Sequence, residues 1–225
     1  MDRNAATCTA KARKARHLQP SRSYIRFESV INRSLNLFSL QAIIDGMLPK
    51  EHNRNELPDM TRASLVLAVA AMDAYFTGIF AERLVPFLKR KGATKDLVEL
   101  LKKAGLDTAV ALELLGMQRP YRRIRTLVEG HLGRHVTQHE KTIDELFLAF
   151  GLKEFCRQVE KKAGRTCLCK SITAVVQRRH QIAHKGDLNS YGKLRGIERR
   201  TMRAKVLDIV KFVSCADDIL QRQLA

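Results

Sequence analysis

The chain has 225 residues, of which 45% are hydrophobic, and its 41 Lys and Arg against 23 Asp and Glu give a formal net charge of +18. This length allows one domain with an ordinary buried core. Its five scattered cysteines argue against a disulfide framework and favour the reducing cytoplasm. The apolar stretch 63–80 is broken by Asp73 and Thr77, so we expect no membrane-spanning helix, and the N-terminus lacks the apolar core of a secretory signal.

The excess of positive charge indicates a polyanionic partner, most simply a nucleic acid. Part of it lies in a short stretch near the N-terminus that contains Lys11, Arg13, Lys14 and Arg16 and shows no apolar periodicity. We therefore expect a flexible basic arm over residues 1–23, followed by a single domain over 24–225. A solvated extension without a role of its own is the alternative for this arm.

Apolar residues recur at helical spacing after the arm, and we find no strand pattern and no internal repeat. In chain order, the expected helices span about 24–48, 59–91, 94–105, 107–116, 121–136, 141–150, 153–163, 171–184 and 196–224. Thr94 and Asp107 are expected to cap the third and fourth of these, and Pro86 can kink the second. The second is apolar around most of its circumference, which predicts the central position in an all-α bundle with two long helices at the start, shorter inserted helices and two more at the end.

The segment from Gln177 to Asp187 holds the strongest candidate for chemistry. His180 and His184 are four positions apart and share one face of the expected helix, and Arg179 directly precedes them. A neutral imidazole can remove a proton, and a guanidinium offers planar donors to a phosphate.

Two other interpretations of this histidine pair stay open. The basic helix end could simply complement the helix dipole and solvate the bundle. The pair could also bind zinc, but the Glu of the metalloprotease motif is absent and a third ligand would have to come from Cys167, Cys169 or a distant carboxylate. We therefore expect no metal and no cofactor.

The six residues Arg179–His184 resemble the motif of the HEPN superfamily, in which Arg, a polar residue and three variable residues precede His, and whose domains are small α-helical bundles. The stretch Ala71–Phe76 is similar to the second-helix region of the RiboL-PSP-HEPN-like branch, where an acidic residue lies among apolar and aromatic neighbours. The resemblance covers about residues 24–220.

This resemblance implies a metal-independent endoribonuclease, often a toxin or an effector in defence against phage, that pairs as a homodimer so that two motifs meet across a cleft. If the family's motif is matched residue by residue to this sequence, Arg179 and His184 would be the catalytic pair and His180 their polar partner. Asp73 would orient Arg179 or His184. It is expected to be buried and paired, so a purely structural tie between helices is its alternative role.

The chemistry of RNA fits such a set of residues. The 2′-OH beside each phosphate is an internal nucleophile, so an enzyme needs a base, a group that stabilises the charged transition state, and an acid for the 5′-oxygen. The expected products are a 2′,3′-cyclic phosphate and a 5′-hydroxyl, formed without a divalent ion.

Basic residues flank the motif and are expected to contact the RNA backbone. They are Arg178, Lys185, Lys193, Arg195, Arg199, Arg200 and Arg203. Tyr191 is the only aromatic residue near the motif, which argues against a protein built on single-strand stacking. Two alternatives to a ribonuclease remain: a non-catalytic module that binds RNA or a nucleotide, and a regulatory bundle whose basic face docks an acidic protein partner such as an antitoxin.

Overall fold

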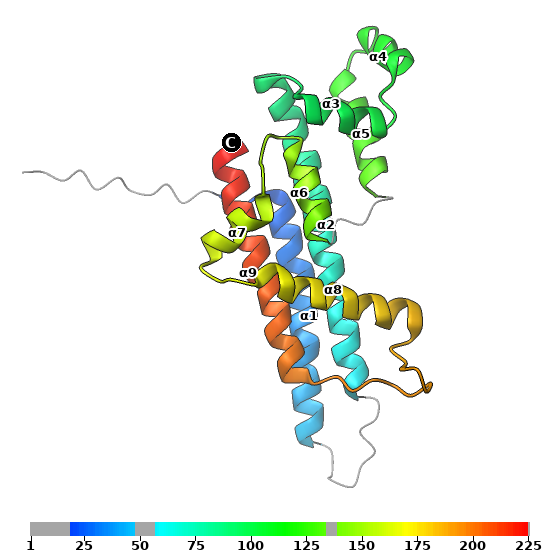
Figure 1. The fold of residues 1–225 in the computed structure, drawn as a ribbon, viewed down its shortest axis with the longest axis vertical. Coiled ribbons are helices and arrows are strands. Elements are labelled where there is room, and N and C mark those ends of the chain that lie inside the picture. Colours follow the sequence, from blue (N-terminus) through cyan, green and yellow to red (C-terminus); the bar gives the residue numbers. More distant parts are fainter. Residues whose placement is uncertain (1–18, 48–56, 134–138, 225) are drawn as a thin grey trace, which may run out of the picture.

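The fold is given by a computed structural model that describes residues 19–47, 57–133 and 139–224. The helices in these ranges are α1 (Arg22–Met47), α2 (Leu57–Lys91), α3 (Lys95–Lys103), α4 (Thr108–Leu115), α5 (Pro120–Leu132), α6 (Glu140–Leu148), α7 (Phe155–Ala163), α8 (Leu168–Lys185) and α9 (Arg199–Leu224). Apart from one isolated β-bridge between Leu188 and Leu194, the described residues form no β-structure. The all-α prediction is therefore confirmed (Figure 1).

Two predicted features fall wholly or partly outside the described residues. The basic arm was expected over 1–23, of which 1–18 lie outside; the expectation is wrong for its last residues, because α1 begins at Arg22 and Ser21 and Ser23 are buried. The expected end of the fifth helix at 136 also lies outside, and α5 is described as far as Leu132.

The central element is α2, which contacts α1, α5, α6, α8 and α9. It runs without interruption through Pro86 to Lys91. By length and composition it is the one helix in the described ranges that could cross a membrane, with a mean hydropathy of 1.7 over an 18-residue window, but 56% of that window is buried inside the fold. Burial by its neighbours thus accounts for the apolar character of α2, as expected for the core helix of a bundle.

An aromatic cluster fills the core between α2, α6 and α9. The ring of Phe76 lies edge-on to those of Phe147 and Phe212, each at 5.9 Å between centroids, and Phe80 stacks on Phe150 at 4.5 Å. Such edge-to-face and stacked pairs add to the stabilisation from burial alone. These ring contacts hold together the part of the bundle against which α8 packs.

The start of α1 is tied to the core by a buried carboxylate. Asp217 of α9 accepts hydrogen bonds from the Ser21 hydroxyl at 2.6 Å and from the Tyr75 hydroxyl at 3.2 Å. Burial, together with the charge of Asp217, raises the pKa of Tyr75 well above its ordinary value, so the phenol stays a proton donor. This cluster has a structural role, because its side chains are satisfied within the core.

Local caps form where the sequence predicts them. The Thr94 hydroxyl accepts from the Leu97 amide at 3.1 Å, and the Asp107 carboxylate accepts from the Val110 amide at 2.8 Å. These caps begin α3 and α4; α5 packs beside the upper part of α2, and α4 projects beyond the upper end of the bundle (Figure 1).

Candidate functional site

The motif lies on the outer end of α8, which crosses the bundle and extends past α2 (Figure 1). Its first half is anchored by five buried residues: Leu168, Cys169, Ile172, Val175 and Val176. After Val176 only Ile182 continues the apolar spacing, partly buried against the core, and residues 177–185 are half-buried or exposed. The helix ends at Gly186, whose φ of 60° is the left-handed conformation that glycine adopts most easily. The structure thus holds the motif on a rigid helix while leaving it open to solvent.

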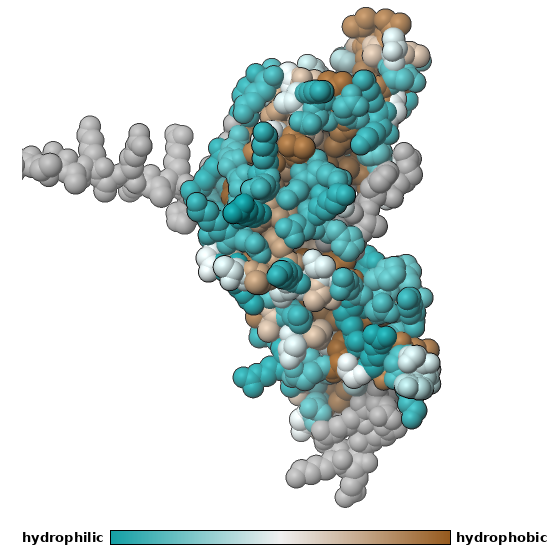
Figure 2. All heavy atoms as spheres, in the orientation of Figure 1, coloured by the Kyte–Doolittle hydropathy of each residue, from teal (hydrophilic) through white to brown (hydrophobic). Residues whose placement is uncertain are grey.

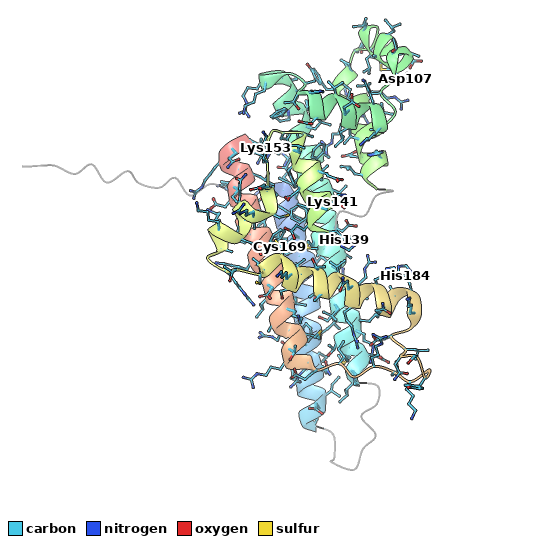
Figure 3. The ribbon with its side chains drawn as sticks, viewed as in Figure 1. Asp107, His139, Lys141, Lys153, Cys169 and His184 are labelled. Carbon is cyan, nitrogen blue, oxygen red and sulfur yellow. The ribbon has the colours of Figure 1, made fainter. Side chains whose placement is uncertain are left out.

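The two histidines of the motif lie together. Their ring centroids are 4.6 Å apart with an interplanar angle of 46°, and both side chains are exposed. His184 is on the last turn of α8, at the edge of the molecule (Figure 3). The predicted shared face of His180 and His184 is confirmed, and a ligand can reach both rings from solvent.

Arg179 faces in another direction, because five residues turn an α-helix by about 500° and leave Arg179 and His184 about 140° apart. Arg179 lines a surface hollow of about 440 Å³ between α2, α5 and α8. Asp73, Thr77 and Glu129 line the same hollow. Within one chain, the structure therefore places Arg179 on the same surface hollow as Asp73, and His184 next to His180.

Asp73 is half-buried, whereas the sequence indicated a buried carboxylate, so the expected burial is wrong. The physical reason is its position on α2: Met72 and Tyr75 point into the core, but Asp73 lies on the side that borders the hollow. There its carboxylate keeps access to solvent. Its predicted role beside Arg179 stays a prediction.

A buried ionic cluster fixes the chain directly after the motif, and the sequence analysis did not find it. Asp187 is fully buried, and its Oδ2 accepts hydrogen bonds from Arg62 Nε and from Arg178 Nη2, each at 2.8 Å. Arg62 also donates to the Arg195 carbonyl at 2.7 Å, and Arg178 to the Gly196 carbonyl at 3.0 Å. The cluster therefore ties the end of α8 and the start of the connection to α9 onto the first turns of α2.

Two signals in the sequence could have pointed to this cluster. Arg62 is a single cation at the start of the most apolar helix, and Asp187 is a single acid that directly follows the helix-ending Gly186. Isolated opposite charges beside apolar segments are stable when buried only if they pair. The sequence offered no means to pair these two, because they are 125 residues apart.

The predicted RNA-binding residues lie on and after the end of α8. Lys185, Lys193, Arg195, Arg200 and Arg203 are exposed, while Arg178 and Arg199 are half-buried. Arg178 is engaged with Asp187 and Gly196, which limits what its guanidinium can offer to a ligand. The exposed members of the set continue the basic surface from His184 towards α9.

The zinc-binding interpretation requires a set of ligands, which the described ranges do not contain. Across residues 19–47, 57–133 and 139–224, no three His, Cys, Asp or Glu side chains come together in a way that could hold a metal ion. Of the two cysteines weighed as third ligands, Cys167 is exposed and Cys169 is buried.

The fold and the motif together define an all-α domain with an exposed Arg/His motif at the end of a late helix. Residues 28–222 match the model of the RiboL-PSP-HEPN family, and the chain belongs to this family. Membership supports an RNA-related role, with nuclease activity as one such role. Neither a curated protein nor a solved structure shows significant similarity to this chain.

Proposed function

We propose that the protein is a metal-independent endoribonuclease whose active site is built from Arg179, His180 and His184. One observation carries this proposal: the two imidazoles lie 4.6 Å apart and open to solvent at the end of α8, in a domain of an RNA-related family. A pair of exposed histidines at this spacing can divide the two proton transfers that RNA cleavage needs.

In the proposed reaction, one neutral imidazole takes the proton of a ribose 2′-OH. The 2′-oxygen then bonds to the adjacent phosphorus, and the bond from phosphorus to the 5′-oxygen breaks. A second, protonated imidazole gives its proton to the leaving 5′-oxygen, and the Arg179 guanidinium stabilises the charge on the phosphate. The products are a 2′,3′-cyclic phosphate and a 5′-hydroxyl. The nucleophile belongs to the RNA, so no step in this sequence uses a metal-bound water.

The active form is proposed to be a homodimer. Arg179 and His184 are about 140° apart around α8, so one copy presents them in different directions. Two copies that pack their α8 ends against each other can place Arg179 of one beside His184 of the other. The exposed basic residues after His184 would then form a continuous track for the RNA backbone. A nuclease of this kind suits a cytoplasmic toxin or an effector of defence against phage, restrained by an antitoxin or another regulatory protein.

The test is cleavage of purified RNA by the purified protein in the presence of a chelator. We expect 2′,3′-cyclic phosphate ends and no cleavage of a 2′-deoxy-substituted RNA. His184→Ala should lower the rate by about 10²- to 10⁴-fold, the usual contribution of a general acid or base. His139→Ala is the matched control, because His139 is also exposed but precedes α6. Cleavage by His184→Ala at the wild-type rate contradicts the proposal.

A non-catalytic RNA-binding module is the second candidate, and the separation of Arg179 from His184 in one chain is the observation that favours it. Analytical ultracentrifugation with bound RNA, read together with the cleavage assay, distinguishes the enzyme from the binding module. A dimer that cleaves RNA supports the enzyme, whereas a monomer that binds RNA without cleaving it supports the binding module.

A further inference from the structure

The segment 188–194, within the connection from α8 to α9, forms a small hairpin with a defined turn. Leu188 and Leu194 form an antiparallel bridge, and the Asn189 amide donates to the Lys193 carbonyl at 2.8 Å. The Asn189 side-chain oxygen accepts from the amides of Tyr191 and Lys193 at 2.9 and 3.0 Å. This side chain therefore shapes the backbone that carries Tyr191.

The base of this hairpin is fixed to the rest of the fold. The Arg195 amide donates to the Asp187 carbonyl at 2.9 Å, and the Asp187 carboxylate is buried between Arg62 and Arg178. The Asp187 amide in turn donates to the Gln181 carbonyl within the motif, at 3.1 Å. The hairpin is thus held in place relative to the motif that precedes it.

The hairpin presents an aromatic ring to solvent among cations. Tyr191 is 86% exposed, and Leu188 and Leu194 are also exposed. Lys185, Lys193 and Arg195 around them are exposed too. In Figure 2 hydrophobic surface lies beside hydrophilic surface over this segment, at the lower right. An exposed aromatic side chain on an ordered turn beside a functional site indicates a ligand contact.

We propose that the Tyr191 hairpin (residues 188–194) is a base-binding subsite, in which the Tyr191 ring stacks on an unpaired RNA base. Lys185, Lys193 and Arg195 contact the phosphates on either side of that base. One ring beside cations supplies a single stacking contact, the same contact that proteins built on single-strand stacking repeat along a row of rings. The turn is already shaped in the free protein, so little conformational entropy is lost when the base binds.

The charge of this surface argues against a second copy of the chain as the occupant. A two-fold interface places the same patch of both copies face to face. Here that would bring Lys193 and Arg195 together with their equivalents, and like charges across an interface oppose association unless a polyanion lies between them, as RNA does in the proposed dimer of α8 ends. A polyanion carrying unpaired bases satisfies both the cations and the ring.

This inference deepens the proposed function and rests on it for the identity of the ligand as RNA. It assigns to the 188–194 hairpin the contact with an unpaired base near the scissile phosphate. In a duplex the base faces are covered by stacking, so Tyr191 could not reach them.

The test is equilibrium binding of a labelled single-stranded oligoribonucleotide, followed by fluorescence anisotropy in a His184→Ala background that prevents cleavage. Adding Tyr191→Ala should raise the Kd by about 5- to 150-fold, the range that corresponds to the loss of one base–aromatic stack. Tyr191→Phe should leave the Kd within about twofold, because the phenyl ring still stacks. Tyr121→Ala is the matched control, since Tyr121 is also exposed but lies on α5. A duplex of the same length should bind Tyr191→Ala and its parent equally.

Each outcome of this experiment decides the proposal. If Tyr191→Ala binds the single strand as tightly as its parent, the subsite is refuted, whether or not the protein cleaves RNA. If binding falls as expected but the wild-type chain cleaves no RNA, the subsite stands and the ribonuclease proposal fails. If Tyr191→Ala instead abolishes self-association or the binding of polyglutamate while RNA binding is unchanged, the hairpin is a protein interface and the proposal is overturned.

Discussion

The two halves of α8 differ sharply, although they form one continuous helix. Residues 168–176 contain five buried side chains that pack into the bundle, whereas residues 177–185 contain none that is fully buried. The first half contributes to stability, and the second half carries the candidate site. This difference explains how the fold can expose a basic motif and still hold the motif in a fixed position. The anchored half of α8 holds the exposed half as a rigid extension.

The exposed half is also fixed at its far end, by the buried cluster of Arg62, Arg178 and Asp187. If this view of α8 is correct, substitutions should separate the two halves. Those at buried anchors should lower the free energy of unfolding, and those on the exposed face should leave it nearly unchanged. The following predictions test this, beginning with the largest expected effect.

Asp187→Ala should lower the free energy of unfolding by about 3–5 kcal/mol, because it leaves the guanidinium of Arg62 buried without its main partner. Asp59→Ala is the matched control, since Asp59 also pairs with Arg62 but has a side chain that is 64% exposed. That change should cost no more than about 1 kcal/mol. Urea unfolding followed by circular dichroism measures both. Equal small losses would mean that the cluster does not anchor the end of α8.

Ile172→Ala should lower the free energy of unfolding by about 2–5 kcal/mol, the usual result of opening a cavity in a packed core. Ile182→Ala makes the same chemical change in the exposed half, where the side chain is only half-buried, and should cost less than half as much. The same urea titration compares the two variants. Ile182 packs against the core only in part, so a larger loss there than at Ile172 would contradict the view that the first half of α8 is the main anchor.

Gly186→Ala should destabilise the protein by about 1–2 kcal/mol, because the φ of 60° at this helix end is unfavourable for a residue with a Cβ. Gly130→Ala should have the opposite sign and stabilise the protein by about 0.5–1 kcal/mol. Gly130 lies inside α5, and a Cβ added there would meet no atom within 4 Å. Thermal unfolding of both variants gives the sign of each change in stability. A stabilising effect of Gly186→Ala would contradict the left-handed conformation at the helix end.

The cysteines should show the smallest effect, a difference in reactivity without a change in stability. Cys167 is exposed at the start of α8 and, of the four cysteines in the described ranges, should react first with iodoacetamide at neutral pH. Cys156 should react slowly, because a hydrogen bond with Cys169 and burial raise the pKa of its thiol and leave it protonated. Mass spectrometry of tryptic peptides over time gives the order. Labelling in urea, where the difference should vanish, is the control.

Local features of the fold could be predicted from the sequence because they depend on neighbours along the chain. Thr94 and Asp107 each cap a helix through an amide three residues later, and Gly186 ends α8 within its own turn. The shared face of His180 and His184 follows in the same way from helical geometry. In each case the partner lies within one turn, so the sequence contains all the information.

Features that depend on packing could not be predicted with the same success. The apolar neighbours of Asp73 indicated burial, but periodicity does not show which side of α2 is left open beside α5 and α8. The pairing of Arg62 with Asp187 was missed because nothing local connects two residues on different elements. The shape of the 188–194 hairpin was missed as well, since its bridge and its Asn189 turn form in a segment without regular apolar spacing.

The sequence by itself determined the helical class of this protein, the positions of most helices and the residues of the motif, because backbone hydrogen bonds and caps within a helix act over three to four residues. Only the tertiary structure decided which of those residues meet. It placed Arg179 and Asp73 around the same surface hollow, joined Arg62 to Asp187 and placed Tyr191 in solvent on a fixed turn. The physical reason is that such contacts arise when whole helices pack together, and the spacing of residues along one helix does not specify the helix against which it will lie.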